Sequence, residues 1–104
     1  MSAATEENKQ RFYLALASIP EGKVTTYGRL AEQAGKSGRA RWAGQMLSHL
    51  PNGSKLPWHR VVNSQGKLSF PQDSEQYQQQ RALLEQEGVE FGLNGGINLK
   101  QFLA

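Results

Sequence analysis

The segment from residue 24 to residue 51 constrains the fold most, because it holds two short helical patterns separated by a glycine. Thr26 can cap the first helix, and Gly35 can end it in a left-handed turn. Ser37 can cap the second helix, and two helices joined by a three-residue turn that begins with glycine are typical of a helix-turn-helix. Apolar residues at helical spacing predict the buried faces. These residues are Tyr27, Leu30, Ala31 and Ala34, then Ala43, Met46, Leu47 and Leu50.

The second of these helices also has an informative outer face. Glycine inside a helix costs up to about 1 kcal/mol relative to alanine, and a solvated face has no reason to accept that cost. The glycine is explained if another backbone comes close to it, and that backbone could be a neighbouring helix or a nucleic acid. The arginine and glutamine beside the glycine favour a nucleic-acid groove. The residues of this face are Arg41, Gly44, Gln45 and Ser48.

The remaining segments predict two further helices and one hairpin. Apolar spacing indicates a first helix that starts near Thr5 and stops before a proline. Residues 60–70 can form a small β-hairpin with a glycine near its turn. A last long helix can be capped by Asp73 or Ser74 and ends at Gly88. Short closing elements follow it.

Length and composition limit the class of protein. The chain has 104 residues, of which 38% are hydrophobic and 20% charged, as expected for one globular domain spanning residues 1–104. We predict a mainly α fold with a small β-hairpin, that is, a winged helix-turn-helix-like DNA-binding domain. No run approaches the roughly 20 apolar residues that span a bilayer, and the start is not a secretory signal. We therefore expect a cytoplasmic protein without membrane association.

The side chains available for chemistry are few. The sequence contains no cysteine, which excludes disulfides, thiolate metal sites and cysteine catalysis. With only His49 and His59 present, we expect no histidine metal site. The sequence also has no phosphate loop that would bind a nucleotide. The prediction is a protein without metal or cofactor.

Positive charge is concentrated in the middle of the chain. The net charge is only +3, yet eight of the 12 Lys and Arg residues lie between Lys23 and Lys67, where Glu32 is the only acid. A basic face of this kind favours binding to a polyanion, and its overlap with the helix-turn-helix pattern favours nucleic acid.

Together these segments resemble the DNA-binding domain of O6-alkylguanine-DNA alkyltransferases, over about residues 12 to 88. That family's reactive motif reads Pro-Cys-His-Arg-Val, and here the sequence is Pro-Trp-His-Arg-Val from Pro57 to Val61. The closest resemblance is to alkyltransferase-like proteins, which replace the cysteine with another residue, often tryptophan. Further matches are Tyr27 with a phosphate-contacting tyrosine, Arg41 and Gly44 with the recognition helix, and Glu87 with a glutamate of the final helix.

The resemblance implies binding without repair. In an alkyltransferase, a histidine oriented by a glutamate activates the cysteine, and here Trp58 replaces that nucleophile. We therefore expect no catalytic residue, and a DNA damage sensor that flips O6-alkylguanine out of double-stranded DNA and flags it for nucleotide excision repair. We also expect a monomer. The predicted DNA-binding residues are Tyr27, Arg41, Gly44, Gln45 and Arg60, and the predicted lesion pocket holds Tyr27, Trp58, His59 and Val61.

Several of these residues have structural alternatives. His59 and Glu87 are predicted to form a hydrogen-bonded structural pair, and Arg60 suits a structural or phosphate role as well as a base contact. Trp42 is predicted to pack structurally. The lesion-covering loop at residues 64–73 departs from the family's glycine-rich version. No asparagine directly follows the recognition helix, although Asn52 lies nearby.

Two other functions remain open from the sequence. A helix-turn-helix regulator would read a defined duplex site and ignore alkylation. An enzyme could use His59 and Glu87 in hydrolysis or in transfer to an acceptor other than a thiol.

Overall fold

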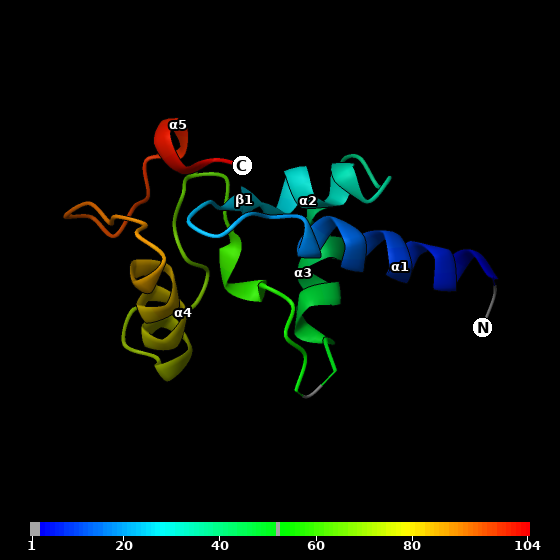
Figure 1. Ribbon diagram of the computed structural model, residues 1–104, viewed down its shortest axis with the longest axis horizontal. Helices are drawn as coiled ribbons and strands as arrows, with labels where there is room; N and C mark the ends of the chain where they lie inside the picture. The colour runs from blue at the N-terminus through cyan, green and yellow to red at the C-terminus, as the bar shows by residue number, and fades with distance from the viewer. Residues whose placement is uncertain (1–2, 52) are drawn as a thin grey trace.

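The computed structural model describes residues 3–51 and 53–104, so Asn52 lies outside the described residues. Five α-helices are present in this part of the chain, with one 3-10 turn and two short strands (Figure 1). In chain order they are α1 (Ala3–Ala17), β1 (Thr25–Thr26), α2 (Tyr27–Gln33), α3 (Ala40–Ser48), the 3-10 turn η1 (Trp58–Arg60), β2 (Val61–Val62), α4 (Glu75–Gln86) and α5 (Leu99–Phe102).

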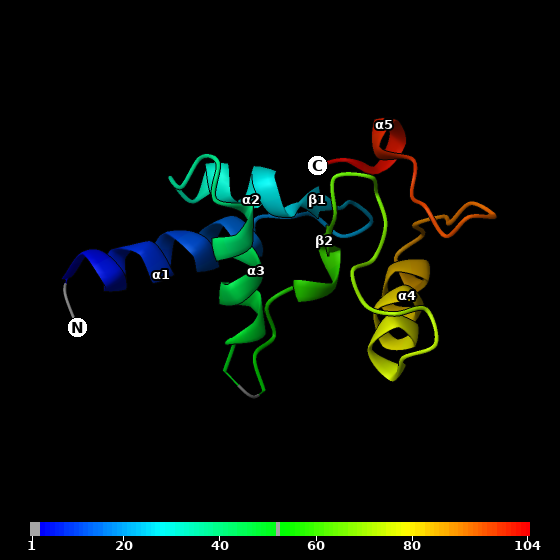
Figure 2. The ribbon, with the colours of Figure 1, turned by 180° about the vertical axis from the view of Figure 1, so that it is seen from behind.

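The molecule has two apolar cores on either side of the small sheet. Helices α1, α2 and α3 enclose one core, whereas α4 and the closing segments enclose the other (Figures 1 and 2). Successive side chains of a strand point to opposite faces, so Val61 enters the first core and Val62 the second. The two-residue strand β2 therefore joins the halves of the fold.

Local capping chemistry sets several helix ends as predicted. The Thr26 hydroxyl accepts a hydrogen bond from the Arg29 N–H at 3.2 Å and caps α2. Ser74 caps α4 in the same way, through the Tyr77 N–H at 3.1 Å. Gly35, with φ of +83°, follows the end of α2 in the left-handed conformation that favours glycine.

Two predicted helix starts are wrong. Ser37 does not cap α3, which begins only at Ala40, and its N-cap residue Arg39 makes no side-chain capping bond. The reason is Gly38, whose φ of +78° keeps the chain in a turn after Ser37. The connection between the two helices is thus longer than three residues. At the other end of the molecule, α1 begins at Ala3 and includes Thr5 rather than starting from it.

The small sheet differs from the predicted hairpin. Strand β2 pairs with β1 in parallel, with Thr25 opposite Val61 and Thr26 opposite Val62. A tight turn does follow β2, because the Gly66 N–H bonds to the Asn63 carbonyl at 2.9 Å. The chain bonds back only to Asn63, whose N–H donates to the Lys67 carbonyl at 2.9 Å, and β2 itself pairs with β1 alone among the described residues. The turn instead packs on a later segment, since the Gly66 carbonyl accepts from the Ile97 N–H at 2.9 Å. The mainly helical class with a small sheet is confirmed, but the hairpin is not.

The closing segments complete the second core. Leu103 pairs in parallel with Val24, which precedes β1, and Phe91 pairs with Ile97 in the antiparallel sense. Phe102 from α5 is buried in this core. Within the described part of the chain, every helix is too short or too polar to cross a membrane.

Candidate nucleic-acid interface

The Trp58 motif is held in place by a buried amide. Residues 58–60 form the 3-10 turn η1, and β2 follows directly. The side chain of Gln80, from α4, donates to the carbonyls of His59 and Val61, each at 3.1 Å. Gln80 is only 3% exposed, so these bonds form away from solvent. Helix α4 thereby fixes the backbone on both sides of Arg60.

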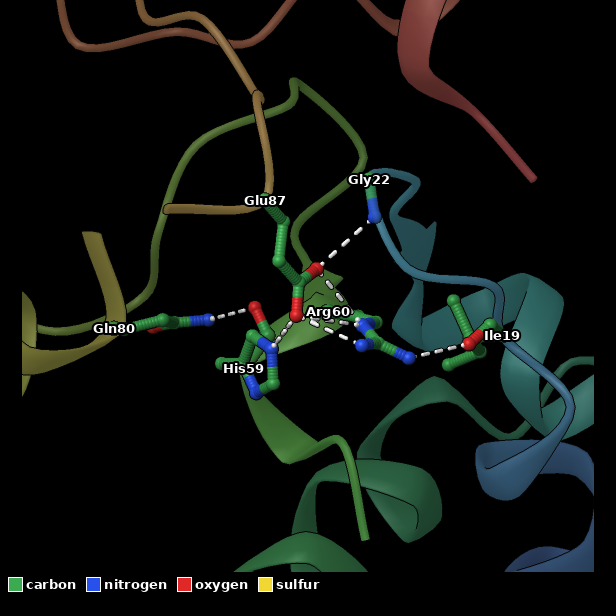
Figure 3. Close-up of polar contacts among 6 residues, drawn as sticks. All are labelled: Ile19, Gly22, His59, Arg60, Gln80 and Glu87. Atoms are coloured by element: carbon green, nitrogen blue, oxygen red, sulfur yellow. Dashed lines mark hydrogen bonds and ion pairs between the residues drawn. The ribbon is translucent and has the colours of Figure 1, made fainter. Parts of the chain in front are cut away.

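The residues after Trp58 point into a buried ionic network around Glu87 (Figure 3). The Nε2–H of His59 donates to Glu87 Oε2 at 2.7 Å, and Arg60 Nη2 donates to the same oxygen at 2.7 Å. The backbone N–H of Gly22 donates to the other carboxylate oxygen at 3.1 Å. Arg60 also donates to the Ile19 carbonyl at 2.7 Å and so reaches across to the end of α1.

This network perturbs the ionisation of the carboxylate. Burial of Glu87 tends to raise its pKa, because a charged group loses hydration in the interior. The hydrogen bonds from Arg60, His59 and the Gly22 N–H outweigh that effect and lower the pKa of Glu87 from 4.5 to about 2. Glu87 is therefore ionised at neutral pH and balances the Arg60 charge inside the protein.

The network changes the expected roles of two residues. The predicted hydrogen-bonded pair of His59 and Glu87 is confirmed. Arg60, predicted as a DNA contact with a structural alternative, has the structural arrangement, since its guanidinium is taken up by Glu87 and Ile19. His59, predicted in the lesion pocket, is not among the residues that line the cavity described next.

A cavity of about 520 Å³ opens between the two halves of the fold beside Trp58. Its walls come from the start of α2, the outer face of α3, the Trp58 motif, the loop after β2 and α4. The lining is mostly apolar. Its residues are Tyr27, Ala40, Arg41, Gly44, Leu47, Ser48, Trp58, Val61, Ser69, Phe70 and Gln80.

Five predicted site residues meet in this cavity: Tyr27, Arg41, Gly44, Trp58 and Val61. Trp58 is only partly buried, so its indole is not sealed in a core. Its ring lies edge-on to the His59 imidazole, with 6.0 Å between centroids. A flat aromatic wall beside a cavity of this volume can receive a planar ring.

The sequence identified the lesion-covering loop at residues 64–73 by resemblance but singled out no residue within it. Ser69 and Phe70 line the cavity from the loop after β2, and the Tyr27 hydroxyl hydrogen-bonds to Ser69 Oγ at 3.0 Å. Phe70 is 38% exposed, so its ring is partly accessible from outside the cavity wall. No periodic pattern marks residues in an irregular loop, so spacing offered no signal for them.

Other missed residues did carry a signal. Gln80 lies three residues after Tyr77 and four before Leu84, both buried, so helical periodicity places it on the inner face of α4. A polar residue on such a face is informative because buried amides need partners. Leu47 was predicted to face the core, and it both packs against the first core and lines the cavity.

The outer face of α3 is open. Arg41, Gln45 and Ser48 are exposed there. Gln45 does not line the main cavity but a second hollow at the start of α3, together with Arg39 and Arg41. A Cβ at Gly44 would meet the Tyr27 ring at 4.0 Å, an ordinary contact, so packing within the protein does not require a glycine. The glycine is better explained by the approach of an external backbone.

Trp42 has the predicted structural role. Its ring packs edge-on against Phe12 of α1, with 5.6 Å between centroids. This contact ties α3 to α1 and leaves the other face of α3 free. The two tryptophans therefore differ, because one stabilises a core and the other borders a cavity.

Comparison with known proteins agrees with this arrangement. Residues 7–89 match the family model described as the 6-O-methylguanine DNA methyltransferase, DNA binding domain. The "DNA base-flipping protein" of Vibrio parahaemolyticus is 46% identical over 92 residues, covering 88% of this chain and 90% of that protein. The "Alkyltransferase-like protein 1" of Schizosaccharomyces pombe is 44% identical over 85 residues, covering 82% of this chain and 79% of that protein.

Solved structures give the same result. S. pombe Atl1 in complex with damaged DNA containing O6-carboxymethylguanine superposes with a TM-score of 0.82 at 39% identity, covering 95% of each chain. Mycobacterium tuberculosis OGT in complex with DNA gives a TM-score of 0.66 at 39% identity, covering 76% of this chain and 48% of that one. The chain, which contains no cysteine, belongs to the 6-O-methylguanine DNA methyltransferase DNA-binding-domain family, among its alkyltransferase-like members.

Proposed function

We propose that this protein binds double-stranded DNA containing O6-alkylguanine, rotates the damaged nucleotide out of the stack and holds it with the adduct intact. The observation that carries the proposal is the cavity of about 520 Å³ beside Trp58 in a chain without cysteine. The proposal is supported by the name of the Vibrio relative and by the damaged DNA bound to S. pombe Atl1.

The energetics of extrusion favour a damaged base. Rotating a nucleotide out of the duplex costs a few kcal/mol, and the cost is lower for a base that pairs poorly, as O6-alkylguanine does. Stacking of a base on an aromatic side chain returns about 1–3 kcal/mol, so contact with Trp58 offsets much of this cost. An intact guanine pays the full cost of unpairing and stays in the duplex.

Three residues have separate roles in this proposal. Arg41, exposed at the start of α3, fills the space that the flipped nucleotide leaves. Tyr27 and Trp58 both line the cavity. Tyr27 contacts the phosphate of the rotated nucleotide, and Trp58 contacts the base and its alkyl group. Gly44 lets the DNA backbone approach α3 closely.

The chemistry of the site favours retention over transfer. An indole is not a nucleophile, and the chain has no thiol to accept an alkyl group. The imidazole Nε2–H of His59 donates to the Glu87 carboxylate at 2.7 Å, which leaves Nδ1 as its basic nitrogen, but the chain has no thiol for that nitrogen to activate. The residues that activate a cysteine in an alkyltransferase here stabilise the motif.

A protein that retains a lesion without removing it needs a downstream process. We propose that the bound complex flags the lesion for nucleotide excision repair. The monomeric state and the cytoplasmic location stay predictions from the sequence.

The test compares matched duplexes with and without one O6-methylguanine. We expect tighter binding to the damaged duplex, and full recovery of O6-methylguanine when the DNA is digested after incubation. Arg41→Ala should reduce this preference at least tenfold, whereas Arg81→Ala, which removes an equal charge above the Phe91 ring, should leave it unchanged. Equal affinity for both duplexes, or loss of the methyl group, would refute the proposal.

A second experiment tests the repair role. Reconstituted excision-repair nucleases should cut the damaged duplex faster when this protein is added, and Arg41→Ala should give a smaller increase. If the protein binds the lesion but incision stays the same or slows, the link to excision repair is wrong while lesion binding stands.

A further inference from the structure

A hydrogen bond crosses the mouth of the cavity. Tyr27 lines the cavity from the start of α2, and Ser69 lines it from the loop that runs from β2 to α4 (Figure 2). The Tyr27 hydroxyl donates to Ser69 Oγ at 3.0 Å, and this bond is exposed to solvent. The Tyr27–Ser69 bond therefore lies at the outer edge of the cavity, where a ligand would enter.

The loop that carries Ser69 is anchored on both sides of this residue. Before it, Leu68 is buried in the second core. After it, the Pro71 carbonyl accepts from the N–H of Ser74 at 3.0 Å and from the Ser74 hydroxyl at 2.7 Å. Between these anchors, no backbone hydrogen bond holds Ser69 or Phe70 within the described part of the chain. A segment with so few bonds can open locally at a low cost in free energy.

This segment is joined to the first half of the fold by one hydrogen bond. Among the described residues, the Tyr27–Ser69 bond is the only hydrogen bond between the loop at 64–73 and the helices α1, α2 and α3. Phe70, next to Ser69, lines the same cavity. The bond therefore holds both residues across the opening, and its loss releases them.

The same tyrosine hydroxyl has a second use in the proposed function, which assigns it to the phosphate of the rotated nucleotide. A phenol has one proton to donate, and a phosphate oxygen can only accept. Tyr27 therefore cannot donate to Ser69 and to the phosphate at the same time. Binding of the rotated nucleotide competes with the Tyr27–Ser69 bond.

We propose that the Tyr27–Ser69 bond is an autoinhibitory contact, which holds Ser69 and Phe70 across the cavity mouth in the free protein and breaks when the phosphate of a rotating nucleotide accepts from Tyr27. In intact DNA the guanine stays in the stack, so the bond persists. This inference rests on the proposed function, because the contact regulates access to the same cavity.

The proposal requires equal and opposite effects on folding and on binding. The bond is present in the free folded protein, but it is absent from the unfolded chain and from the lesion complex. Its removal should therefore lower the folding equilibrium constant and raise the affinity for the lesion by the same factor. For one exposed hydrogen bond this factor is about two to five, the equivalent of about 0.4–1 kcal/mol.

The experiment uses Ser69→Ala, with Ser64→Ala as the matched control, because Ser64 is exposed in the same loop but does not line the cavity. Urea unfolding should show a loss of about two- to fivefold in the folding equilibrium constant of Ser69→Ala. The same substitution should cost nothing in a Tyr27→Phe background, where the bond is already absent.

DNA titrations supply the second measurement. Ser69→Ala should bind a duplex with one O6-methylguanine more tightly than wild type, by the factor found in urea unfolding. Its affinity for the matched guanine duplex should stay at the wild-type value. The control Ser64→Ala should match wild type in both titrations and in urea unfolding.

The outcomes separate this inference from the proposed function. If Ser69→Ala binds the lesion with unchanged or lower affinity, Ser69 has a structural or supporting role and the inference is wrong, while lesion binding stands. Wild-type stability of Ser69→Ala, or an equal gain in affinity for both duplexes, would also overturn the inference. If wild-type protein does not distinguish the two duplexes, the proposed function fails and the inference fails with it.

Discussion

Replacement of Glu87 by glutamine should destabilise the protein in a pH-dependent manner. The carboxylate accepts from Arg60, His59 and the Gly22 N–H, and its pKa is lowered from 4.5 to about 2. One pKa unit corresponds to about 1.4 kcal/mol, so ionised Glu87 stabilises the folded state on the order of 3 kcal/mol. Its side chain is only 11% exposed, so screening by solvent is small.

The sign of the pH dependence follows from the lowered pKa. A group whose pKa is depressed by folding stabilises the protein above its unfolded-state pKa, and this contribution is lost as the pH falls toward the folded-state value. Wild-type protein should therefore lose this contribution between pH 4.5 and pH 2. Glu87→Gln should be less stable at pH 7, and the difference from wild type should close over the same range.

Urea unfolding monitored by tryptophan fluorescence at several pH values measures this difference. Glu85→Gln is the matched control, because Glu85 lies near Glu87 on α4 but its side chain is 54% exposed. Its one ion pair among the described residues joins Glu85 Oε2 to Arg81 Nε at 3.6 Å. An exposed pair of this kind contributes about 0.5 kcal/mol, so the control should change little. If the difference between wild type and Glu87→Gln stays constant from pH 7 to pH 2, or is no larger than that of the control, the network does not have the stabilising role described.

Three other substitutions test stability, and the first of them also tests DNA binding. Gly44→Ala should raise the melting temperature, since alanine favours a helix by up to about 1 kcal/mol. The same substitution should weaken DNA binding in a titration, because the methyl group keeps the DNA backbone away from α3. Unchanged affinity would contradict the role of Gly44. Gly66→Ala should destabilise the protein by more than about 2 kcal/mol in urea unfolding, because φ is +79° and the new Cβ would clash with the Ile97 carbonyl; wild-type stability would contradict the turn geometry. Thr25→Val should increase stability by about 1 kcal/mol, because the buried hydroxyl has no partner among the described residues; a loss measured by the same method would point to an unseen hydrogen bond.

Local signals in the sequence predicted much of the fold, and long-range pairing did not follow from them. Thr26 and Ser74 were identifiable as caps because a side chain bonds to a backbone N–H three residues away. Ser37 was misassigned since one glycine after it was enough to delay the helix. Strand β2 was given a neighbouring partner, but its real partner is β1, and no local pattern encodes that pairing.

The candidate site divides in the same way. Tyr27, Arg41 and Trp58 were found through family motifs, and the structure brings them to one cavity. Arg60 and His59 belong to the same motif but both turn inward, because the Glu87 carboxylate accepts hydrogen bonds from both side chains. That partner is distant in sequence, so the direction of each side chain could be seen only in the folded chain.

The division of β2 between two cores links stability to recognition. Val61 and Val62 are consecutive, yet each fills a different core, and Val61 also borders the cavity. A change of side-chain volume deep in either half is thus transmitted to one short backbone segment, three residues from the indole. Substitutions in either core can therefore change the shape of the cavity without contacting a ligand. Mutational scans should find core positions that alter DNA binding although they lie far from the DNA.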